Sequence, residues 1–143
     1  MSLPQPRVLI VEDDPELLLL LRSNLELAGF DTSLAADGIT ALRRIEAESP
    51  DAVVVDLMLP GLDGWSIIAE VRDMTEPPAV IVCSARSNPE DRRRAFEWGA
   101  RSYVQKPFEV DELVGAVLQA VGQPGELAPL RTTTLPLSNP ELA

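Results

Sequence analysis

One stretch decides the fold of this chain: Val53-Val54-Val55-Asp56-Leu57-Met58-Leu59-Pro60-Gly61-Leu62-Asp63-Gly64. It begins with three β-branched residues, which are typical of a strand that is buried on both faces. The strand ends on a carboxylate, and the Pro-Gly and Asp-Gly pairs that follow are turn residues. Asp56 is therefore predicted to lie at the carboxyl end of a central strand, the edge where open α/β sheets bind ligands. An isolated aspartate would more often cap the following turn, so the other strand ends have to be considered.

Four further runs of apolar and β-branched residues predict the other strands, and a helical pattern follows each strand. The predicted strands are 7–11, 30–35, 53–55, 79–83 and 102–105. The helices are expected at about 15–28, 38–49, 64–72, 89–98 and 110–121, with Pro, Gly and capping residues near their ends. Five alternating units predict an α/β, flavodoxin-like (βα)5 fold: a five-stranded parallel sheet of order 2-1-3-4-5 with helices on both faces. In that order, the topological switch point, where the strand order reverses its direction, lies between the first and third strands.

The chain of 143 residues is long enough for one domain with a substantial core. We expect an N-terminal extension over residues 1–6, a single domain over residues 7–121, and a Pro/Thr-rich linker or C-terminal tail over residues 122–143. After Gly122 the sequence contains four prolines and three consecutive threonines, without a helical or strand period.

Charge and residue usage exclude several function classes. The net charge of −11 opposes direct nucleic acid binding, which needs clustered cations. No apolar run approaches the roughly 20 residues of a membrane span, and the first residues do not form a signal peptide. The single cysteine, Cys83, is expected in the core and fits a reducing, cytoplasmic location. The chain has no His, and Lys106 is its only Lys, which indicates a need for an ammonium group at that position.

Polar side chains follow four of the predicted strands at the same edge of the sheet: Glu12 and Asp13, Asp56, Ser84, and Lys106. Clustered carboxylates repel one another unless a cation neutralises them, and an oxygen-only donor set favours Mg²⁺. A hydroxyl and an ammonium group beside that metal would contact phosphoryl oxygens. Asp56 lies at the centre and is the candidate nucleophile for an acyl phosphate. Asp14 before Pro15 is expected to cap the first helix, whereas Glu12 and Asp13 have no such local role.

The same residues belong to a set of motifs with fixed spacing: Val11-Glu12-Asp13-Asp14, Asp56 to Gly64, Ser84-Ala85, Gly99-Ala100 and Tyr103 to Phe108. With these motifs the sequence resembles the receiver domain of bacterial two-component response regulators, over roughly Arg7 to Val121. The resemblance implies that Asp56 accepts a phosphoryl group from the phosphohistidine of a histidine kinase or phosphotransfer protein. The domain would then switch conformation to control a partner or output domain. It would catalyse only its own phosphorylation and dephosphorylation.

The resemblance also implies a role for each site residue. Lys106 and Ser84 would contact phosphoryl oxygens, as would the backbone of Leu57, Met58 and Ala85. Mg²⁺ would be held by Asp13, Asp56 and the backbone carbonyl of Met58, and by Glu12 through a water molecule. Ser84 and Tyr103 would be the switch residues, with Ser84 moving toward the phosphoryl group and Tyr103 turning inward. The Lys106–Pro107 bond is typically cis in such domains, although most X–Pro bonds are trans.

The implied partner surface is the face of the fourth helix, the fifth strand and the fifth helix. A homodimer formed on phosphorylation is left open. Regulators of the winged-helix transcription-factor class that dimerise through this face usually carry acidic residues where Arg101-Ser102 stands here. They also carry a basic residue in the fifth helix, which has none here. That salt-bridged dimer is therefore not expected.

Two other functions fit parts of the pattern. A haloacid-dehalogenase-type phosphohydrolase also combines an Asp nucleophile, Mg²⁺, a hydroxyl and a Lys. It places a second Asp two residues after the nucleophile as general acid–base, and Met58 occupies that position here. Flavin binding on the same fold lacks a loop rich in hydroxyls or glycines after the first strand.

Overall fold

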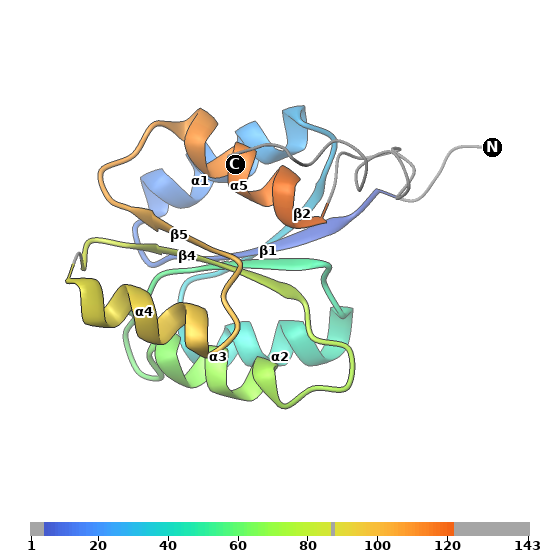
Figure 1. Cartoon of the computed structure of the whole chain (residues 1–143). Helices are drawn as coiled ribbons and strands as arrows, with labels where there is room; N and C mark the ends of the chain where they lie inside the picture. Colours follow the sequence, from blue (N-terminus) through green and yellow to red (C-terminus); the bar gives the residue numbers. More distant parts are fainter. Residues whose placement is uncertain (1–4, 87, 122–143) are drawn as a thin grey trace, which may run out of the picture.

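The computed structural model describes residues 5–86 and 88–121, which form a three-layer α/β structure (Figure 1). The central sheet is parallel and has the order β2-β1-β3-β4-β5. The strands are β1 (Arg7–Val11), β2 (Asp31–Ala35), β3 (Ala52–Val55), β4 (Ala79–Ser84) and β5 (Ser102–Gln105). The predicted fold class and strand order are confirmed. The predicted tail, residues 122–143, and most of the predicted N-terminal extension lie outside the described residues.

Five helices cover the two faces of the sheet, with α1 and α5 on one face and α2, α3 and α4 on the other (Figure 1). They are α1 (Pro15–Leu27), α2 (Gly38–Glu48), α3 (Gly64–Arg72), α4 (Pro89–Glu97) and α5 (Val110–Val121). Asp14 caps α1 as predicted, because its carboxylate accepts hydrogen bonds from the backbone N–H groups of Glu16 and Leu17. No helix within the described ranges is long and apolar enough to cross a membrane.

The boundaries differ from the sequence expectations at a few positions. β2 begins one residue later than predicted, at Asp31, and β4 extends through Ser84. Ser84 is therefore the last residue of a strand, and its backbone pairs in register with Gln105 of β5. The helix α4 ends at Glu97, before the predicted limit, and Gly99 follows with a φ of 109°. Such a φ suits glycine after a helix, because other residues rarely adopt it.

The sheet separates two hydrophobic clusters. The cluster under α1 and α5 contains Leu21, Leu25, Leu113 and Val117, which lie on one side of these two helices. Cys83 lies in this cluster with an exposed fraction of 1%, as expected for a packing residue. Burial raises the pKa of the Cys83 thiol to about 12, so the thiolate is disfavoured there.

The opposite cluster lies under α2, α3 and α4. The side chains that α3 buries in it are Ile67, Ile68 and Val71. Trp65 is only partly buried and packs against the edge of this cluster.

Trp65 also joins α3 to the end of α4. Its ring stands edge-on to that of Trp98, with 5.5 Å between the ring centroids. The guanidinium of Arg94 lies 4.1 Å from the Trp65 ring centroid and 4.4 Å from that of Trp98. These contacts give both tryptophans a packing role between the two helices.

The loop after β3 returns tightly against the strand end, and Gly64 makes this approach possible. A Cβ atom at Gly64 would contact the carbonyl oxygen of Asp56 and would lie 2.7 Å from the Cα of Leu57. The backbone N–H of Gly64 donates to the carbonyl of Leu57 at 3.1 Å. The first residue of α3 is therefore packed directly onto the backbone that carries Asp56.

We predict that Gly64→Ala destabilises the domain by about 1–3 kcal/mol, because the added methyl group overpacks against backbone atoms that cannot rotate away. Gly115→Ala is the matched control, since Gly115 lies inside α5 and no atom lies within 4 Å of an added Cβ. That change should stabilise the domain by about 0.5–1 kcal/mol. Urea unfolding followed by circular dichroism measures both effects. A Gly64→Ala variant as stable as the native chain would contradict the close-packing argument.

Candidate functional site

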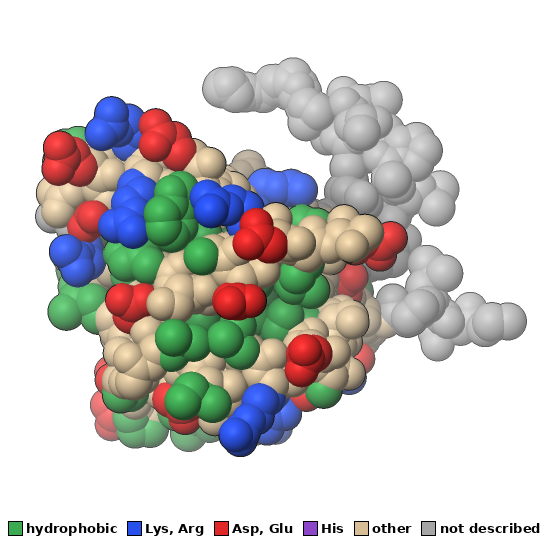
Figure 2. All heavy atoms as spheres, turned by 90° about the horizontal axis from the view of Figure 1, so that it is seen from below, with side chains coloured by type: hydrophobic (Ala, Val, Ile, Leu, Met, Phe, Trp, Pro, Cys, Tyr) green, Lys and Arg blue, Asp and Glu red, His purple; other side chains and the backbone are tan. Residues whose placement is uncertain are grey.

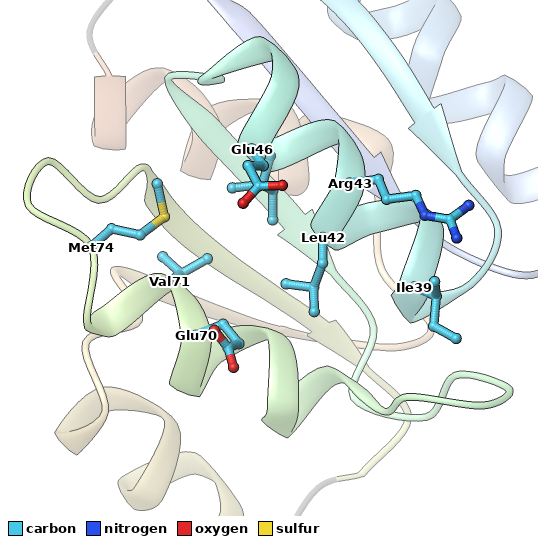
Figure 3. A pocket seen from close by; sticks show the side chains of 8 residues that line it. Ile39, Leu42, Arg43, Glu46, Glu70, Val71 and Met74 are labelled. Atoms are coloured by element: carbon cyan, nitrogen blue, oxygen red, sulfur yellow. The ribbon is translucent and has the colours of Figure 1, made fainter.

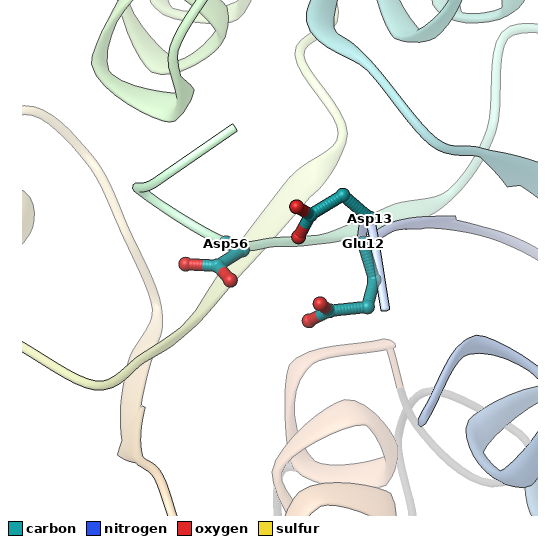
Figure 4. A group of neighbouring side chains, drawn as sticks. All are labelled: Glu12, Asp13 and Asp56. Carbon is teal, nitrogen blue, oxygen red and sulfur yellow. The ribbon is translucent and has the colours of Figure 1, made fainter. Parts of the chain in front are cut away.

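Three carboxylates meet at the carboxyl ends of β1 and β3. The side chains of Glu12, Asp13 and Asp56 each place an oxygen within 4.8 Å of the other two, and they point toward a common space (Figure 4). Their backbone positions follow from the sheet, because Val11 of β1 lies in register with Val55 of β3. Glu12 and Asp56 are almost fully buried, with exposed fractions of 2% and 5%, while Asp13 is exposed.

The ammonium group of Lys106 lies between two of these carboxylates. Its Nζ atom donates to Oε1 of Glu12 and to Oδ2 of Asp56, both at 2.8 Å. Lys106 follows β5, which is two strands away from β3 in the sheet, so the long side chain reaches across the end of β4. Its backbone N–H donates to the carbonyl of Ser84 at 2.8 Å, which fixes the start of the side chain. The Lys106–Pro107 peptide bond is cis.

Burial and pairing set the protonation of this group of side chains. Burial alone would lower the pKa of Lys106, but the hydrogen bonds to Asp56 and Glu12 outweigh it and raise that pKa. Burial raises the pKa of Glu12, and the hydrogen bonds from Lys106 and from the Asp14 N–H partly offset this effect. The site therefore holds a charged ammonium group beside a glutamate whose ionised form is disfavoured by burial.

The Glu12 contact with Asp14 corrects one expectation. Oε2 of Glu12 accepts a hydrogen bond from the backbone N–H of Asp14 at 3.0 Å, so Glu12 does have a local structural role. Asp13 makes no comparable hydrogen bond within the described residues and stays open to solvent. The two adjacent acids are therefore not equivalent.

Asp56 is held at both oxygens. Oδ2 accepts from Lys106, and Oδ1 accepts from the backbone N–H of Met58 at 3.0 Å. Leu57 is buried, whereas the side chain of Met58 is 56% exposed beside the carboxylate. The backbone of Met58 is therefore part of the site, while its side chain is largely exposed to solvent.

The two predicted switch residues are connected through the backbone of Arg86. Ser84 is fully buried, and its Oγ accepts from the Arg86 N–H at 3.2 Å. The Tyr103 hydroxyl donates to the Arg86 carbonyl at 2.8 Å, and the ring is 6% exposed. Tyr103 therefore points inward in this structure. Ala85, which lies between Ser84 and Arg86 in the sequence, is exposed.

Sequence reasoning placed the strand-end residues correctly on one edge but missed three contacts. It did not anticipate the ion pair of Lys106 with Glu12, the bridging backbone of Arg86, or the position of Arg92, whose guanidinium lies 5.1 Å from the Tyr103 ring centroid. For the ion pair a signal did exist, since the only lysine follows a strand that ends at the same edge as two buried acids. No sequence signal identified the other two contacts.

An apolar groove lies away from these residues. It occupies about 410 Å³ between α2 and α3, where Leu42 and Val71 face each other and Met74 lies at one end (Figure 3). None of the predicted site residues lines it. The polar edge of the sheet is therefore the candidate site, and its oxygen-only donor set fits Mg²⁺.

The strand order β2-β1-β3-β4-β5, together with an acidic cluster and a paired lysine at the switch point, defines a class of protein. The family model of the response regulator receiver domain matches residues 8–118, and the chain belongs to this family. It is thus a receiver domain, the phosphoacceptor module of two-component signalling. This assignment displaces the phosphohydrolase and flavin-binding alternatives.

Among full-length relatives, the chain is similar to the transcriptional regulatory protein PrrA of Mycobacterium leprae, with 42% identity over 130 residues. This match covers 91% of the chain and 56% of PrrA. The transcriptional regulatory protein KdpE of Mycobacterium tuberculosis is 39% identical, over 80% of the chain and 50% of KdpE. The chain therefore spans about half the length of the relatives that it matches.

Solved structures give the same result. The receiver domain of a Francisella response regulator is 33% identical, with a TM-score of 0.78, over 82% of this chain and 97% of that one. The receiver domain of the sensor histidine kinase PA1611 from Pseudomonas aeruginosa is 31% identical, with a TM-score of 0.74, over 83% of this chain and 99% of that one. The latter contains a magnesium ion coordinated in the active site cleft.

We predict that Lys106→Met destabilises the domain by about 3 kcal/mol at pH 7, because it leaves two buried carboxylates without their cation. The pKa of Glu12, already raised, should rise further. A carboxyl group whose pKa is higher in the folded than in the unfolded state destabilises the fold at pH values above its folded-state pKa. It has no such effect at pH values below its unfolded-state pKa. The loss should therefore shrink as the pH falls toward the ordinary range of Glu.

Urea unfolding at pH 7 and near pH 4.5 measures this dependence. Glu12→Gln in the Lys106→Met background is the matched control, since it removes one of the two facing charges and should recover part of the stability at pH 7. A loss from Lys106→Met that is equal at both pH values would contradict the electrostatic explanation.

Proposed function

We propose that Asp56 is the phosphoacceptor of this receiver domain. The observation that carries this proposal is the buried Asp56 carboxylate, held between the Lys106 ammonium and the Met58 N–H with two further acids within 4.8 Å. An Asp56 oxygen would attack the phosphorus of the donor and form the acyl phosphate. The bond from phosphorus to the donor's nitrogen or oxygen would break, and its electron pair would leave with the donor.

The neighbouring groups support this step by positioning and by charge neutralisation. Lys106 would transfer one hydrogen bond from Asp56 to a phosphoryl oxygen, while Ser84 would bind another after releasing the Arg86 N–H. Backbone groups of Leu57, Met58 and Ala85 border the same space. The freed Arg86 backbone would let Tyr103 change its hydrogen bond, which supports a switch role for both residues.

Mg²⁺ would be held by Asp13, Asp56 and the Met58 carbonyl, with Glu12 acting through water. When bound, the ion would neutralise negative charge on the phosphoryl group and the carboxylates. Asp13 is suited to direct binding because its carboxylate is exposed, whereas the oxygens of Glu12 already accept from Lys106 and Asp14. This difference supports the two separate modes of binding.

The remaining predictions concern the chain as a whole. The phosphoryl donor would be a histidine kinase or phosphotransfer protein, and the output partner would bind the face of α4, β5 and α5. The following expectations also stay as predictions: self-catalysed phosphorylation and dephosphorylation, a homodimer on phosphorylation, the absence of direct nucleic acid binding, a cytoplasmic location and the domain limits 7–121.

Phosphorylation with a small donor tests the proposal directly. With Mg²⁺ and acetyl phosphate, the intact mass should rise by one phosphoryl group, and Asp56→Asn should abolish the increase. Asp63→Asn is the control: Asp63 is the N-cap of α3, a position that asparagine fills equally well, and this variant should label normally. Labelling that survives Asp56→Asn would move the phosphoacceptor to another residue.

We also predict that Mg²⁺ raises the melting temperature through binding to the folded state. Asp13→Asn should lose most of this increase, because it removes the open carboxylate of the cluster. Asp14→Asn should keep it, since Asp14 caps α1 and asparagine caps helices as well. Thermal unfolding with and without Mg²⁺ measures the three proteins, and an equal loss in both variants would refute the separation of roles.

The lifetime of the acyl phosphate should be long, in the range of minutes or more. Hydrolysis needs a water molecule in line with Asp56, and the exposed apolar side chain of Met58 offers no acceptor to orient it. Arg86 also cannot act as a base, and its Nε atom donates to Oδ2 of Asp91 at 2.8 Å. Replacing Met58 with Asn and Arg86 with Glu should accelerate loss of the phosphoryl group. Native decay within seconds after donor removal, or slower decay of the double variant, would contradict this prediction.

A further inference from the structure

The apolar groove between α2 and α3 has no part in the chemistry proposed above. Leu42 and Val71 face each other across it, and Met74 lies at one end (Figure 3). At the other end, the side chain of Ile39 is 54% exposed, which is high for a large apolar residue. Figure 2 views the side of the molecule that α2, α3 and α4 cover, and it shows hydrophobic side chains gathered between acidic ones. A hollow lined by apolar side chains in contact with water is the kind of surface that binds an apolar segment.

Two further hollows connect this groove to the end of α5. The first, of about 660 Å³, lies beyond the ends of α2 and α3, and Met74 lines both it and the apolar groove. The second, of about 260 Å³, shares Asp51 and Pro77 with the first and is also lined by Val121, the last residue of α5. Asp51 and Pro77 come just before β3 and β4, so both hollows lie at the amino-terminal edge of the sheet. The three hollows therefore follow one another from the end of α5 to the apolar groove.

The sequence after Val121 has the composition of a segment that could bind in such a groove. Residues 122–143 contain five leucines, at positions 127, 130, 135, 137 and 142. A flexible linker is usually poor in large apolar residues. The four prolines restrict the backbone, which reduces the conformational entropy lost on binding. Three of the leucines lie in the segment Leu130–Leu137, where Arg131 is the only charged residue.

The length of the chain allows this segment to reach the groove. At about 3.1 Å per residue in a polyproline II conformation, the chain from Val121 spans up to about 28 Å at Leu130 and about 50 Å at Leu137. A compact domain of this size has a radius of gyration of about 13 Å, so a path around one of its edges is of the order of 30 Å. The covalent connection gives an effective concentration in the millimolar range, so even a weak contact would be populated.

Charge favours this segment over a second copy of the chain. Glu46 and Glu70 line the groove together with Arg43, and neither glutamate forms an ion pair within the described residues. Arg131 supplies the cation that this surface lacks. In a two-fold symmetric contact, each groove would bring two acids and one arginine against the same set, which leaves excess negative charge on both sides. The net charge of −11 adds to the repulsion between two copies.

We propose that the segment Leu130–Leu137 of this chain folds back across the amino-terminal edge of the sheet and binds the apolar groove between α2 and α3. Its leucines would contact Leu42 and Ile39, and Arg131 would pair with one of the two glutamates that line the groove. The domain would in this way cover its own apolar surface. None of the predicted site residues lines the groove, so the proposal is independent of the phosphoacceptor assignment.

Cleavage by trypsin tests the proposal, because Arg131 is the only basic residue after Lys106 and lies within the segment. Intact mass follows the loss of residues 132–143 from the full chain. A synthetic peptide of residues 122–143, cleaved at the same bond, gives the rate for an unbound segment. Cleavage of the full chain should be about tenfold slower, since trypsin acts only on the released segment. This protection should not depend on protein concentration, because the contact lies within one chain.

Variants of the groove identify where the segment binds. Ile39→Ser removes an exposed apolar contact and should accelerate cleavage about threefold. The double variant Glu46→Gln, Glu70→Gln should also accelerate it and should reduce its dependence on salt. Leu19→Ser is the matched control, because Leu19 is 55% exposed but belongs to α1, on the opposite face of the sheet (Figure 1). The control should be cleaved as slowly as the native chain.

A native chain that is cleaved as fast as the peptide would overturn the proposal. So would protection that both groove variants leave unchanged, or that Leu19→Ser removes, since the segment would then bind elsewhere. Protection that increases with protein concentration, together with a dimer in sedimentation equilibrium, would assign the groove to a second copy. The measurement needs no phosphoryl donor, so its outcome is separate from that of the Asp56 labelling experiment.

Discussion

The site depends on one interaction, the placement of the Lys106 ammonium group between the carboxylates of Glu12 and Asp56. Two acids from neighbouring strands would otherwise repel each other in a nearly dry environment, where their charges are poorly screened. The ammonium group of Lys106 donates a hydrogen bond to each of them at 2.8 Å and so offsets this repulsion. Asp13 stands outside these two contacts, and its side chain is exposed. The Asp56 carboxylate, the proposed phosphoacceptor, is therefore held at both oxygens by Lys106 and the Met58 N–H.

The parallel sheet makes this arrangement possible. Because β1 and β3 are neighbours at the switch point, their carboxyl ends place Glu12 and Asp56 together. Lys106 follows β5, and its long side chain reaches both acids. The backbone beneath is rigid, since Gly64 packs against the strand end. The contacts that we propose to change on phosphorylation are a few hydrogen bonds, chiefly those that Ser84 and Tyr103 make with Arg86. This separation of a fixed acid cluster from adjustable loop contacts suits a domain with two states.

Sequence reasoning predicted the parts that depend on periodicity and local chemistry. The helix spans and the cap at Asp14 follow from patterns within a few residues, whereas the strand order follows from the alternation of five strand–helix units along the chain. The buried face of a helix is harder to predict where the apolar residues do not form a single stripe, as in α3, which buries the adjacent residues Ile67 and Ile68. Burial of a tryptophan depends on neighbours from another helix, here Arg94 and Trp98, and these are not local in sequence.

The candidate site was predictable in its members but not in their pairing. Residues at strand ends are brought to one edge by topology alone, which is why Asp56, Ser84 and Lys106 could be named. Which atom contacts which depends on side-chain length and on competition among partners. The double role of Glu12, which accepts from Lys106 and from the Asp14 backbone, is settled only in three dimensions.

The burial of Cys83 has a practical consequence for following the switch. The chain has only this cysteine, and its thiol is both inaccessible and held protonated in the folded domain. A second cysteine introduced on the surface, for example at the exposed end of α4, would therefore be the sole site that reacts with a maleimide dye under native conditions. A spectroscopic probe can be attached to this domain without removing any natural residue of the core.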